Sequence, residues 1–402
     1  MNITIITTDP FPYGDAASNR IISYSRELVK QDCNICVHCL QPYIRSSHPS
    51  NEPKPLVRGT YDGISYIYPA QTVIWPETGK HPLRKIFLKI KSYLGSFVEL
   101  VKNRKQIDIV QVYTTRLFVF YYYWVICRLL GFKYVVERNE LPTVVKNAEY
   151  YQRTILRKLY ASLTLKSFKC FDGWIIETQY LADYYIPQAK KDTQYCIIPM
   201  TVEHERFDVS REETSYGRYI AYCGNMREDD GVSILLEAFS IIHSTVPDVK
   251  LLLAGESNDT PQQKEFARKL GIEEYVVFLG KLHRDDVPSL LKNATILALA
   301  SPTSLRSCAS MPCKVGEYLC TGNPIVVTSL GEIPKYLTDG ENAYLAEPDS
   351  PQKFAEKLKE ALNESADKLS AIGLEGQKTA IKHFGSQQQA VQINKFFNSL
   401  IK

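Results

Sequence analysis

The stretch Ser310-Met-Pro-Cys-Lys-Val-Gly-Glu-Tyr-Leu-Cys-Thr-Gly-Asn-Pro-Ile-Val-Val-Thr328 contains a helix start, a helix stop and a new strand. Ser310 is predicted to cap a helix over Cys313–Cys320, with Pro312 in its first turn. Gly322 suits the left-handed position after a helix, and the proline at 324 prevents continuation into the apolar strand 325–328. Helices and strands that alternate in this way are typical of an α/β fold.

The start of this helix is a predicted seat for phosphate, because its unpaired N–H groups and positive dipole end favour an anion. Lys314 adds a formal charge there. Glu317 lies about 7 Å further along the axis, at roughly 1.5 Å per residue. That is about the reach from a diphosphate to a ribose, whose adjacent hydroxyls a carboxylate can accept. The stretch therefore indicates a nucleoside-diphosphate site; the alternative is an ordinary amphipathic helix before a buried strand.

This stretch resembles the nucleotide-sugar signature of the family 4 glycosyltransferases, retaining enzymes with the two-domain GT-B fold. The signature has a carboxylate, seven residues, and then Glu-Ala/Tyr-x-x-x-Gly-x-Pro-Val-Val. Here Glu317-Tyr-Leu-Cys-Thr-Gly-Asn-Pro-Ile-Val326 matches the second half, whereas Ala309 stands where the first carboxylate falls. The resemblance implies that Glu317 holds the ribose. It also implies that a short backbone segment faces the sugar and the phosphates: Ser310, Met311, Pro312 and Cys313.

Length and composition describe a folded protein of two domains. The chain has 402 residues, of which 45% are hydrophobic and 23% charged. Its net charge of +4 is unevenly distributed, since residues 1–190 carry 25 Lys and Arg against 15 Asp and Glu. The basic first half indicates an anionic surface partner.

No targeting or membrane-spanning segment is predicted. Residues 1–8 begin directly as a strand, and the longest uncharged apolar run, Leu117–Cys127, is short of the ~20 residues that cross a bilayer. Ten cysteines in a chain of this length suit a reducing compartment better than a disulfide scaffold. We expect a cytoplasmic protein that is at most peripheral on the inner face of the plasma membrane.

Strands and helices alternate along both halves, which predicts parallel sheets covered by helices. A loop is predicted over 9–20 and a helix over about 21–31. The predicted strands are 2–7, 34–40, 64–67, 107–112, 133–136, 173–177, 195–198, 219–223, 249–253, 275–278, 295–298 and 325–328. Ile198–Phe207 resembles the interdomain linker of the family, with Met200-Thr201 in place of its Asn-Gly turn. The expected architecture is two doubly wound Rossmann-like domains that face an interdomain cleft.

The resemblance implies four segments. Residues 1–195 form an acceptor-binding domain, 196–207 the linker, 208–380 a nucleotide-sugar-binding domain, and 381–402 a helix that packs back toward the first domain.

A second family-like segment, Tyr222–Phe239, follows a strand, contains Gly224 and opens a helix, so it suits a phosphate loop. The family pattern is Gly-Arg-x-x-x-x-Lys-Gly, with both cations on the diphosphate. Here Asn225 and Asp230 replace them, and a carboxylate near phosphate repels it. Arg227 and Lys314 are the substitutes that we expect; the alternative for Arg227 is a solvated loop charge.

Two segments of the first half are assigned to the reacting groups by resemblance. Gly14 matches a glycine turn whose small size permits close approach of a phosphate or acceptor, and Arg20 is placed toward the acceptor. The alternative for this segment is a simple strand-to-helix turn. Many relatives carry a histidine where this chain has Glu137-Arg138-Asn139-Glu140, so the candidate catalytic contacts are Arg138, Asn139 and Glu140. A buried carboxylate–arginine brace is the alternative.

Leu282, in the loop after the strand 275–278, is assigned to the border of the nucleobase by resemblance, through backbone atoms. The neighbouring His283 is expected to be exposed; the alternative is that it stacks on the nucleobase. The run Cys33-Asn-Ile-Cys36-Val-His-Cys39 has a spacing used by metal clusters. Because alternation along a strand sends Cys36 to the opposite face from Cys33 and Cys39, no metal site is predicted.

Residues 83–106 combine seven basic residues and one acid with apolar residues at helical spacing. Such a helix can lie on an anionic membrane. The alternative is a surface helix whose apolar face packs on the sheet.

Taken together, these features predict a retaining, metal-independent glycosyltransferase without a cofactor, which moves a sugar from a nucleoside diphosphate to a hydroxyl. Its expected partners are the nucleotide-sugar donor and a glycan or lipid-linked acceptor of the kind used for surface polysaccharides, and no nucleic acid. The main alternative, favoured by Ala309, Asn225 and Asp230, is a catalytically inactive nucleotide-sugar-binding or scaffold protein. A dinucleotide-dependent oxidoreductase is weaker, because no Gly-x-Gly-x-x-Gly follows the first strand.

Overall fold

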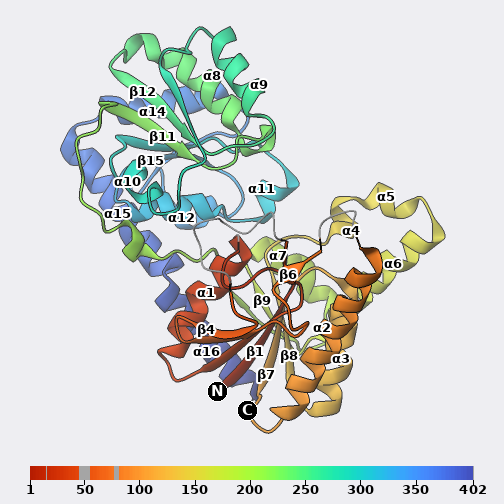
Figure 1. Ribbon diagram of the computed structural model, residues 1–402. Helices are drawn as coiled ribbons and strands as arrows, with labels where there is room; N and C mark the ends of the chain where they lie inside the picture. The colour runs from red at the N-terminus through yellow and green to blue at the C-terminus, as the bar shows by residue number, and fades with distance from the viewer. Residues whose placement is uncertain (15, 45–54, 77–80, 402) are drawn as a thin grey trace. The chain divides into compact units, whose positions relative to one another are not determined.

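The computed structural model describes residues 1–14, 16–44, 55–76 and 81–401 (Figure 1). The chain forms two compact units. Unit 1 consists of Met1–Ile198 together with Ser386–Lys402, and unit 2 consists of Pro199–Gly385. Both are α/β structures.

Unit 1 is built on an eight-stranded sheet with the order β10-β9-β8-β7-β1-β2-β5-β4. Neighbouring strands are parallel except for β4 and β5, which pair antiparallel. The strands are β1 (Asn2–Thr7), β2 (Asn34–Cys39), β4 (Arg58–Tyr61), β5 (Ile64–Ile67), β7 (Ile109–Tyr113), β8 (Lys133–Arg138), β9 (Gly173–Ile176) and β10 (Gln194–Ile197), beside a separate pair of β3 (Tyr43–Ile44) and β6 (Ile74–Trp75).

The helices of unit 1 come from both ends of the chain. They are α1 (Ala16–Val29), α2 (Pro82–Lys102), α3 (Leu117–Leu130), α4 (Thr143–Lys146), α5 (Ala148–Gln152), α6 (Ile155–Lys166), α7 (Gln179–Tyr185) and α16 (Ser386–Ile401). The predicted loop over 9–20 is too long, because α1 already begins at Ala16. Helix α16 packs against α1 and β10, so the last helix completes the apolar core of unit 1.

Unit 2 has a six-stranded parallel sheet with the order β13-β12-β11-β14-β15-β16. In this order the chain moves outward from β11 in one direction and then, from β14, in the other. The strands are β11 (Arg218–Cys223), β12 (Val249–Ala254), β13 (Val276–Gly280), β14 (Ile296–Leu299), β15 (Ile325–Thr328) and β16 (Tyr344–Ala346). The helices are α8 (Val232–Ile242), α9 (Thr260–Lys269), α10 (Val287–Lys292), α11 (Leu305–Ala309), α12 (Cys313–Cys320), α13 (Ile333–Tyr336), α14 (Pro351–Asn363) and α15 (Ala366–Phe384).

All twelve predicted strands are present, with ends within two residues of the prediction. Strands β4 and β16 and the pair β3–β6 are too short or too polar for alternation to reveal. Cys33 and Cys39 are buried in the core of unit 1, whereas Cys36, on the other face of β2, is partly exposed. In the described parts of the chain, no helix combines the length and the apolar character that crossing a membrane requires.

Candidate functional site

Helix α12 begins and ends where its sequence predicts. Its buried side includes Val315, Gly316 and Leu319, and a Cβ at Gly316 would lie 3.1 Å from the sulfur of Met200. Gly322 follows the helix with a φ of +71°, in the left-handed region that glycine favours. The packing of Gly316 fixes which side of α12 faces away from the core.

The predicted cap of this helix is wrong. Ser310 is extended and ends α11, where its Oγ donates to the carbonyl oxygen of Arg306 at 2.8 Å. Pro312 takes the N-cap position of α12. The sequence reasoning missed α11, a short helix with its own capping box between Ser304 and Ser307. Because α11 ends so close to α12, Ser310 serves the end of the earlier helix.

The segment between α11 and α12 alternates between the core and the surface. Ala309 and Met311 are buried, Pro312 is half-buried and Cys313 is exposed. Ala309, which stands where the resembled signature has a carboxylate, is the last residue of α11. The roles predicted for this backbone stay predictions.

The loops after β11 and β14 meet at the point where the strand order of unit 2 reverses, which is where α/β sheets bind ligands. Gly231 closes the loop after β11 with a φ of +82°. A Cβ at this position would lie 1.9 Å from the carbonyl oxygen of Ala300, just after β14. Only glycine allows the two loops to approach this closely. The loop after β11 therefore lies against the segment that leads to α11 and α12.

Gly224 makes room for Lys314. A Cβ at Gly224 would lie 2.0 Å from the Cε of Lys314, whose ammonium donates to the hydroxyl of Tyr222 at 3.1 Å. Burial lowers the pKa of Lys314, and the nearby Asp230 partly opposes this effect. The two predicted phosphate-site residues are thus adjacent, and Lys314 comes to the loop after β11 from α12. Asn225 is exposed beside them.

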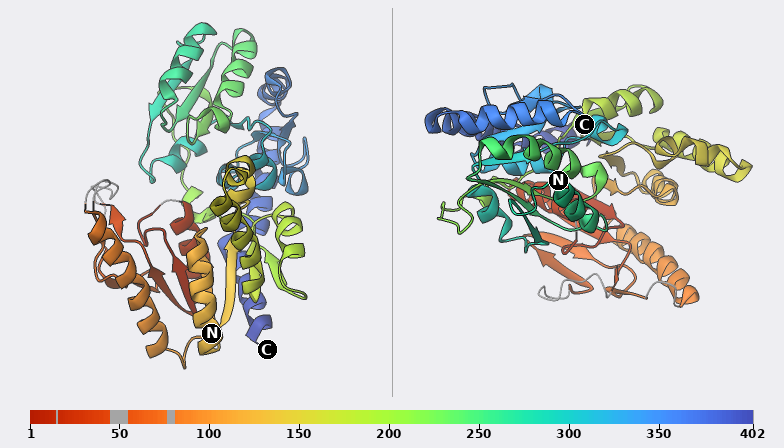
Figure 2. Two further views of the ribbon diagram at one scale, coloured as in Figure 1. Left: turned by 90° about the vertical axis from the view of Figure 1, so that its right-hand side faces the viewer. Right: turned by 90° about the horizontal axis from the view of Figure 1, so that it is seen from above.

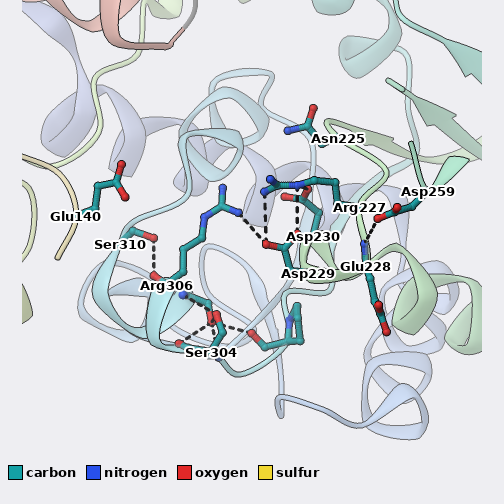
Figure 3. Close-up of polar contacts among 12 residues, drawn as sticks. Glu140, Asn225, Arg227, Glu228, Asp229, Asp230, Asp259, Ser304, Arg306 and Ser310 are labelled. Atoms are coloured by element: carbon teal, nitrogen blue, oxygen red, sulfur yellow. Dashed lines mark hydrogen bonds and ion pairs between the residues drawn. The ribbon is translucent and has the colours of Figure 1, made fainter. Parts of the chain in front are cut away.

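Asp230 is paired with both of the substitutes predicted for the missing cations, Arg227 and Lys314, and Figure 3 shows its pair with Arg227. Its carboxylate lies 3.3 Å from Nε of Arg227 and 3.5 Å from Nζ of Lys314. The adjacent Asp229 lies 3.2 Å from Arg227 and 3.3 Å from Arg306. The carboxylates of Asp229 and Asp230 are therefore compensated by neighbouring cations. They do not present an unpaired negative charge to a phosphate.

We call these five side chains the switch-point cluster: Arg227, Asp229, Asp230, Arg306 and Lys314. It contains three cations and two carboxylates, so it carries one net positive charge. Arg306 was missed by the sequence reasoning, because α11, which carries it, was itself missed.

Glu317 lies one turn beyond Lys314 on α12. Its carboxylate is 3.7 Å from Arg206, and 35% of its side chain is exposed. Burial raises the pKa of Glu317, an effect that Arg206, Arg284 and Lys314 oppose. Glu317 is therefore recessed and near cations, yet accessible to a ligand. Arg206 belongs to the segment Ile198–Phe207 that resembles the interdomain linker of the family, and that resemblance gave no reason to place it in the site.

The loop after β13 turns at Gly280, which has a φ of +70°. Leu282 is half-buried, and His283 and Arg284 are exposed. The predicted exposure of His283 is confirmed. Arg284 is 3.8 Å from Glu203 and its carbonyl oxygen accepts from Arg206 at 3.3 Å. The loop that is predicted to border the nucleobase is therefore hydrogen-bonded to Arg206, the cation beside Glu317.

In unit 1, the expected orientation of Arg20 toward an acceptor is wrong. Arg20 is buried, with its Nε 2.5 Å from Glu137 and its NH2 group donating to the carbonyl oxygen of Ile198 at 2.8 Å. Glu137 also accepts from Tyr24 at 3.0 Å and from Gln111 at 2.7 Å. Glu137 of the segment 137–140 is thus part of a buried carboxylate–arginine brace, and its arginine is Arg20.

The three candidate catalytic side chains differ in their surroundings. Arg138 is buried and donates to the hydroxyl of Tyr185 at 3.0 Å and to the carbonyl oxygen of Thr114 at 3.1 Å. Asn139 is half-buried and donates to the hydroxyl of Tyr113 at 2.8 Å. Glu140 is exposed and pairs with Lys146. Only Asn139 and Glu140 therefore present surface to a ligand.

Gly14 is required by packing inside its own loop. A Cβ there would lie 2.2 Å from the hydroxyl of Ser18 and 2.6 Å from the carbonyl oxygen of Pro10. The close approach of a ligand that was predicted for Gly14 stays a prediction.

Comparison with known proteins finds a family match that lies in unit 2. Residues 217–364 match the family model of glycosyl transferases group 1. The N-acetyl-α-D-glucosaminyl L-malate synthase of Bacillus anthracis is 24% identical over 221 residues, which cover 54% of this chain and 55% of that protein. The mannosylfructose-phosphate synthase of Agrobacterium fabrum is 27% identical over 140 residues, which cover 33% and 30%. The chain thus spans from about a third to just over half the length of these curated relatives.

Solved structures resemble the whole chain. A glycosyltransferase from Rickettsia africae has a TM-score of 0.71 at 14% identity, covering 100% of this chain and 99% of that one. The Anabaena protein HepE in complex with UDP has a TM-score of 0.70 at 14% identity, covering 99% and 100%. At this identity the likeness shows the fold, which is of the GT-B type, and the predicted fold class is confirmed. The matched model and these neighbours together support the resemblance to group 1 glycosyl transferases.

Proposed function

We propose that the protein is a glycosyltransferase that moves a sugar from a nucleoside-diphosphate donor to a hydroxyl acceptor. The observation that supports this most strongly is the switch-point cluster with Glu317 one turn further along α12. Three cations gather where an α/β sheet binds its ligands, and an accessible carboxylate follows at the spacing of a ribose. HepE, which has the same fold, is named in complex with UDP and with UDP-glucose.

In this proposal, Lys314, Arg227 and Arg306 bind the diphosphate, and Glu317 accepts hydrogen bonds from the ribose. Charge develops on the diphosphate as the bond to the sugar breaks. Fixed cations in a partly desolvated site stabilise that charge, which is usually the largest catalytic contribution. Because these side chains already provide the neutralising charge, we propose that the reaction needs no metal ion or cofactor. We further propose that the sugar keeps its anomeric configuration.

The acceptor is proposed to be a glycan or a lipid-linked sugar of a surface polysaccharide. Asn139 and Glu140 are the accessible candidates for polar contacts with the reacting groups in unit 1. We propose a cytoplasmic protein that is peripheral to an anionic membrane; the basic first half of the chain supports the contact with the membrane.

A thermal-shift titration with uridine and guanosine diphosphates tests donor binding. One of them is expected to raise the melting temperature, and Glu317→Ala is expected to abolish the shift. Glu237→Ala, on α8 in the same unit, is the matched control and should keep it. An equal shift for wild type and Glu317→Ala would contradict the role of Glu317.

A scaffold without catalysis remains the second candidate, since Ala309 and Asn225 lack side chains that the resembled signature uses. Transfer and hydrolysis assays over a panel of nucleotide sugars separate the two. Turnover supports the transferase, and it should persist when a chelator is added. Nucleotide binding without turnover of any donor, in the presence of a lipid extract, supports the scaffold.

A further inference from the structure

Helix α2 contacts the sheet of unit 1 through small polar residues. The hydroxyl of Ser92 donates to the carbonyl oxygen of Leu40 at 2.8 Å. The hydroxyl of Ser96 is 2.8 Å from Nδ1 of His38 and accepts from the hydroxyl of Tyr123 at 2.7 Å. Both serines are buried. The inner side of α2 therefore carries small polar residues at its centre.

Close packing fixes this orientation. A Cβ at Gly95 would lie 2.5 Å from the carbonyl oxygen of Pro69, so the helix approaches the neighbouring backbone closely. The other buried residues of α2 are Leu88 and Leu100, which flank the serines at steps of four. Rotation of the helix about its axis would replace these contacts by clashes with larger side chains.

As a result, the apolar side of α2 is exposed. At about 100° per residue, its large apolar side chains lie opposite Ser92 and Ser96. The expected alternative, that this apolar face packs on the sheet, is wrong. These side chains are between 37% and 80% exposed: Leu83, Ile86, Phe87, Ile90, Leu94, Phe97 and Val98.

Two neighbouring helices extend the exposed apolar surface. The hydroxyl of Tyr122, on α3, donates to the carbonyl oxygen of Tyr93 on α2 at 2.9 Å, and Tyr121 donates to the carbonyl oxygen of Leu163 on α6 at 2.8 Å. Of the residues of α6, all of them described, only Thr164 is buried. Figure 2, left, views the molecule from the side on which the three helices lie. The exposed apolar residues of α3 and α6 are Phe118, Val125, Leu129, Ile155, Leu156, Leu159, Tyr160, Leu163 and Leu165.

We call this surface the α2–α3–α6 face. Soluble monomers rarely expose apolar patches of this extent without a binding partner. The partner must also satisfy the charge on the face, which is strongly positive. Arg128 is paired with Asp172 at 2.9 Å; the other basic residues of the three helices are Arg84, Lys85, Lys89, Lys91, Lys102, Arg157, Lys158 and Lys166. Their sequences contain one acid, Glu99, which pairs with Arg58 at 2.8 Å.

We propose that the α2–α3–α6 face lies on an anionic membrane, with its apolar side chains at the level of the headgroups and its cations on the lipid phosphates. An apolar stripe beside lysine and arginine is the pattern of helices that lie in the membrane interface. A second copy of the chain fits less well, because a symmetric contact would bring the same cations together. The inference rests on the peripheral location proposed above and names the surface that makes the contact; it does not require catalysis.

Co-sedimentation of the full chain with vesicles tests this inference. Wild type is expected to bind vesicles that contain phosphatidylglycerol and to bind vesicles of phosphatidylcholine alone much less. The triple substitution Ile86→Gln, Ile90→Gln and Leu94→Gln should weaken binding by more than about tenfold, since each removes an apolar side chain from the membrane. These side chains are exposed, so circular dichroism should show an unchanged fold.

The matched control is Ile241→Gln with Leu374→Gln, in unit 2, where the two side chains are 46% and 50% exposed. This variant should bind vesicles like wild type. Equal binding by the triple variant and wild type would overturn the assignment of the face while leaving a peripheral location intact. Absence of wild-type binding to either vesicle would overturn both. Self-association that the triple variant abolishes, without vesicle binding, would show that the face joins two copies. None of these readouts depends on nucleotide binding or turnover.

Discussion

Asp230 stands where the resembled family has a cation, yet it does not leave the site negative. Its side chain is 8% exposed and is paired with Arg227 and Lys314. A diphosphate that binds these cations competes with the carboxylate of Asp230 for the same charges. The cations of the free site are therefore partly neutralised, and the ion pairs that must rearrange offset part of the attraction for a donor.

Replacement of this competitor should strengthen binding. Asp230→Asn is expected to raise the affinity for the preferred nucleoside diphosphate by about threefold to tenfold, because one unit of negative charge leaves the site. It should also lower the free energy of unfolding by about 1 kcal/mol through loss of the partly buried pairs. Isothermal titration calorimetry and urea unfolding measure the two effects.

The control for this substitution is Asp248→Asn, which breaks an exposed pair with Arg218 in the same unit. It should leave the affinity unchanged. Weaker nucleotide binding by Asp230→Asn would instead show that Asp230 holds the cations in the positions that a diphosphate needs.

At the scale of the element, α2 reverses the usual arrangement of a surface helix. Most helices of this length bury their large apolar residues and expose serine and glycine. In α2, Ser92, Gly95 and Ser96 lie against the sheet side, and the leucines and isoleucines of the opposite side are exposed. The stability of unit 1 should therefore depend on the buried residues of α2, the two serines together with Leu88 and Leu100, and little on its large exposed side chains.

Two substitutions at adjacent positions test this reversal. Alanine in place of a helical glycine ordinarily adds about 1 kcal/mol of stability. Gly95→Ala is instead expected to lower the free energy of unfolding by about 1–3 kcal/mol, because its Cβ meets the backbone of Pro69. Leu94→Ala, at a side chain that is 56% exposed, should change it by less than about 0.5 kcal/mol. Urea unfolding measures both, and the opposite order of effects would show that α2 packs through its apolar side.

At the scale of the whole molecule, unit 1 is closed by the last helix of the chain. Residues Ile393, Phe396 and Phe397 of α16 belong to the same apolar core as β1 and β2, more than 350 positions earlier. A Cβ at Gly173 on β9 would lie 2.8 Å from the ring of Phe396. Segments from both ends of the chain therefore share the core of unit 1.

Phe397→Ala should consequently act on the first half of the chain. It is expected to lower the stability of unit 1 by about 3–5 kcal/mol, the usual cost of emptying a buried phenylalanine site. Hydrogen exchange should accelerate in β1, β2 and β10 and remain slow in β11 and β12 of unit 2. Val391→Ala, at an α16 residue that is 54% exposed, serves as the control and should leave both units unchanged. Faster exchange in unit 2 alone would contradict this account.

Local signals in the sequence determined where the elements lie. Apolar alternation located the strands within two residues, and Gly322 with Pro324 located the end of α12, because such signals depend on neighbours a few positions away. Lys314 and Glu317 were recognised as a potential nucleotide site for the same reason, since both belong to a single helix.

Only the tertiary structure determined which charged side chains pair with each other. Arg20 is bound to Glu137, a residue 117 positions away, and the pairing of Asp230 with Lys314 joins the loop after β11 to α12. The orientation of α2 depends in the same way on contacts with distant backbone at Leu40 and Pro69. The spacing of apolar residues along a helix shows which face they occupy. Only the folded topology determines whether that face meets the core or a partner.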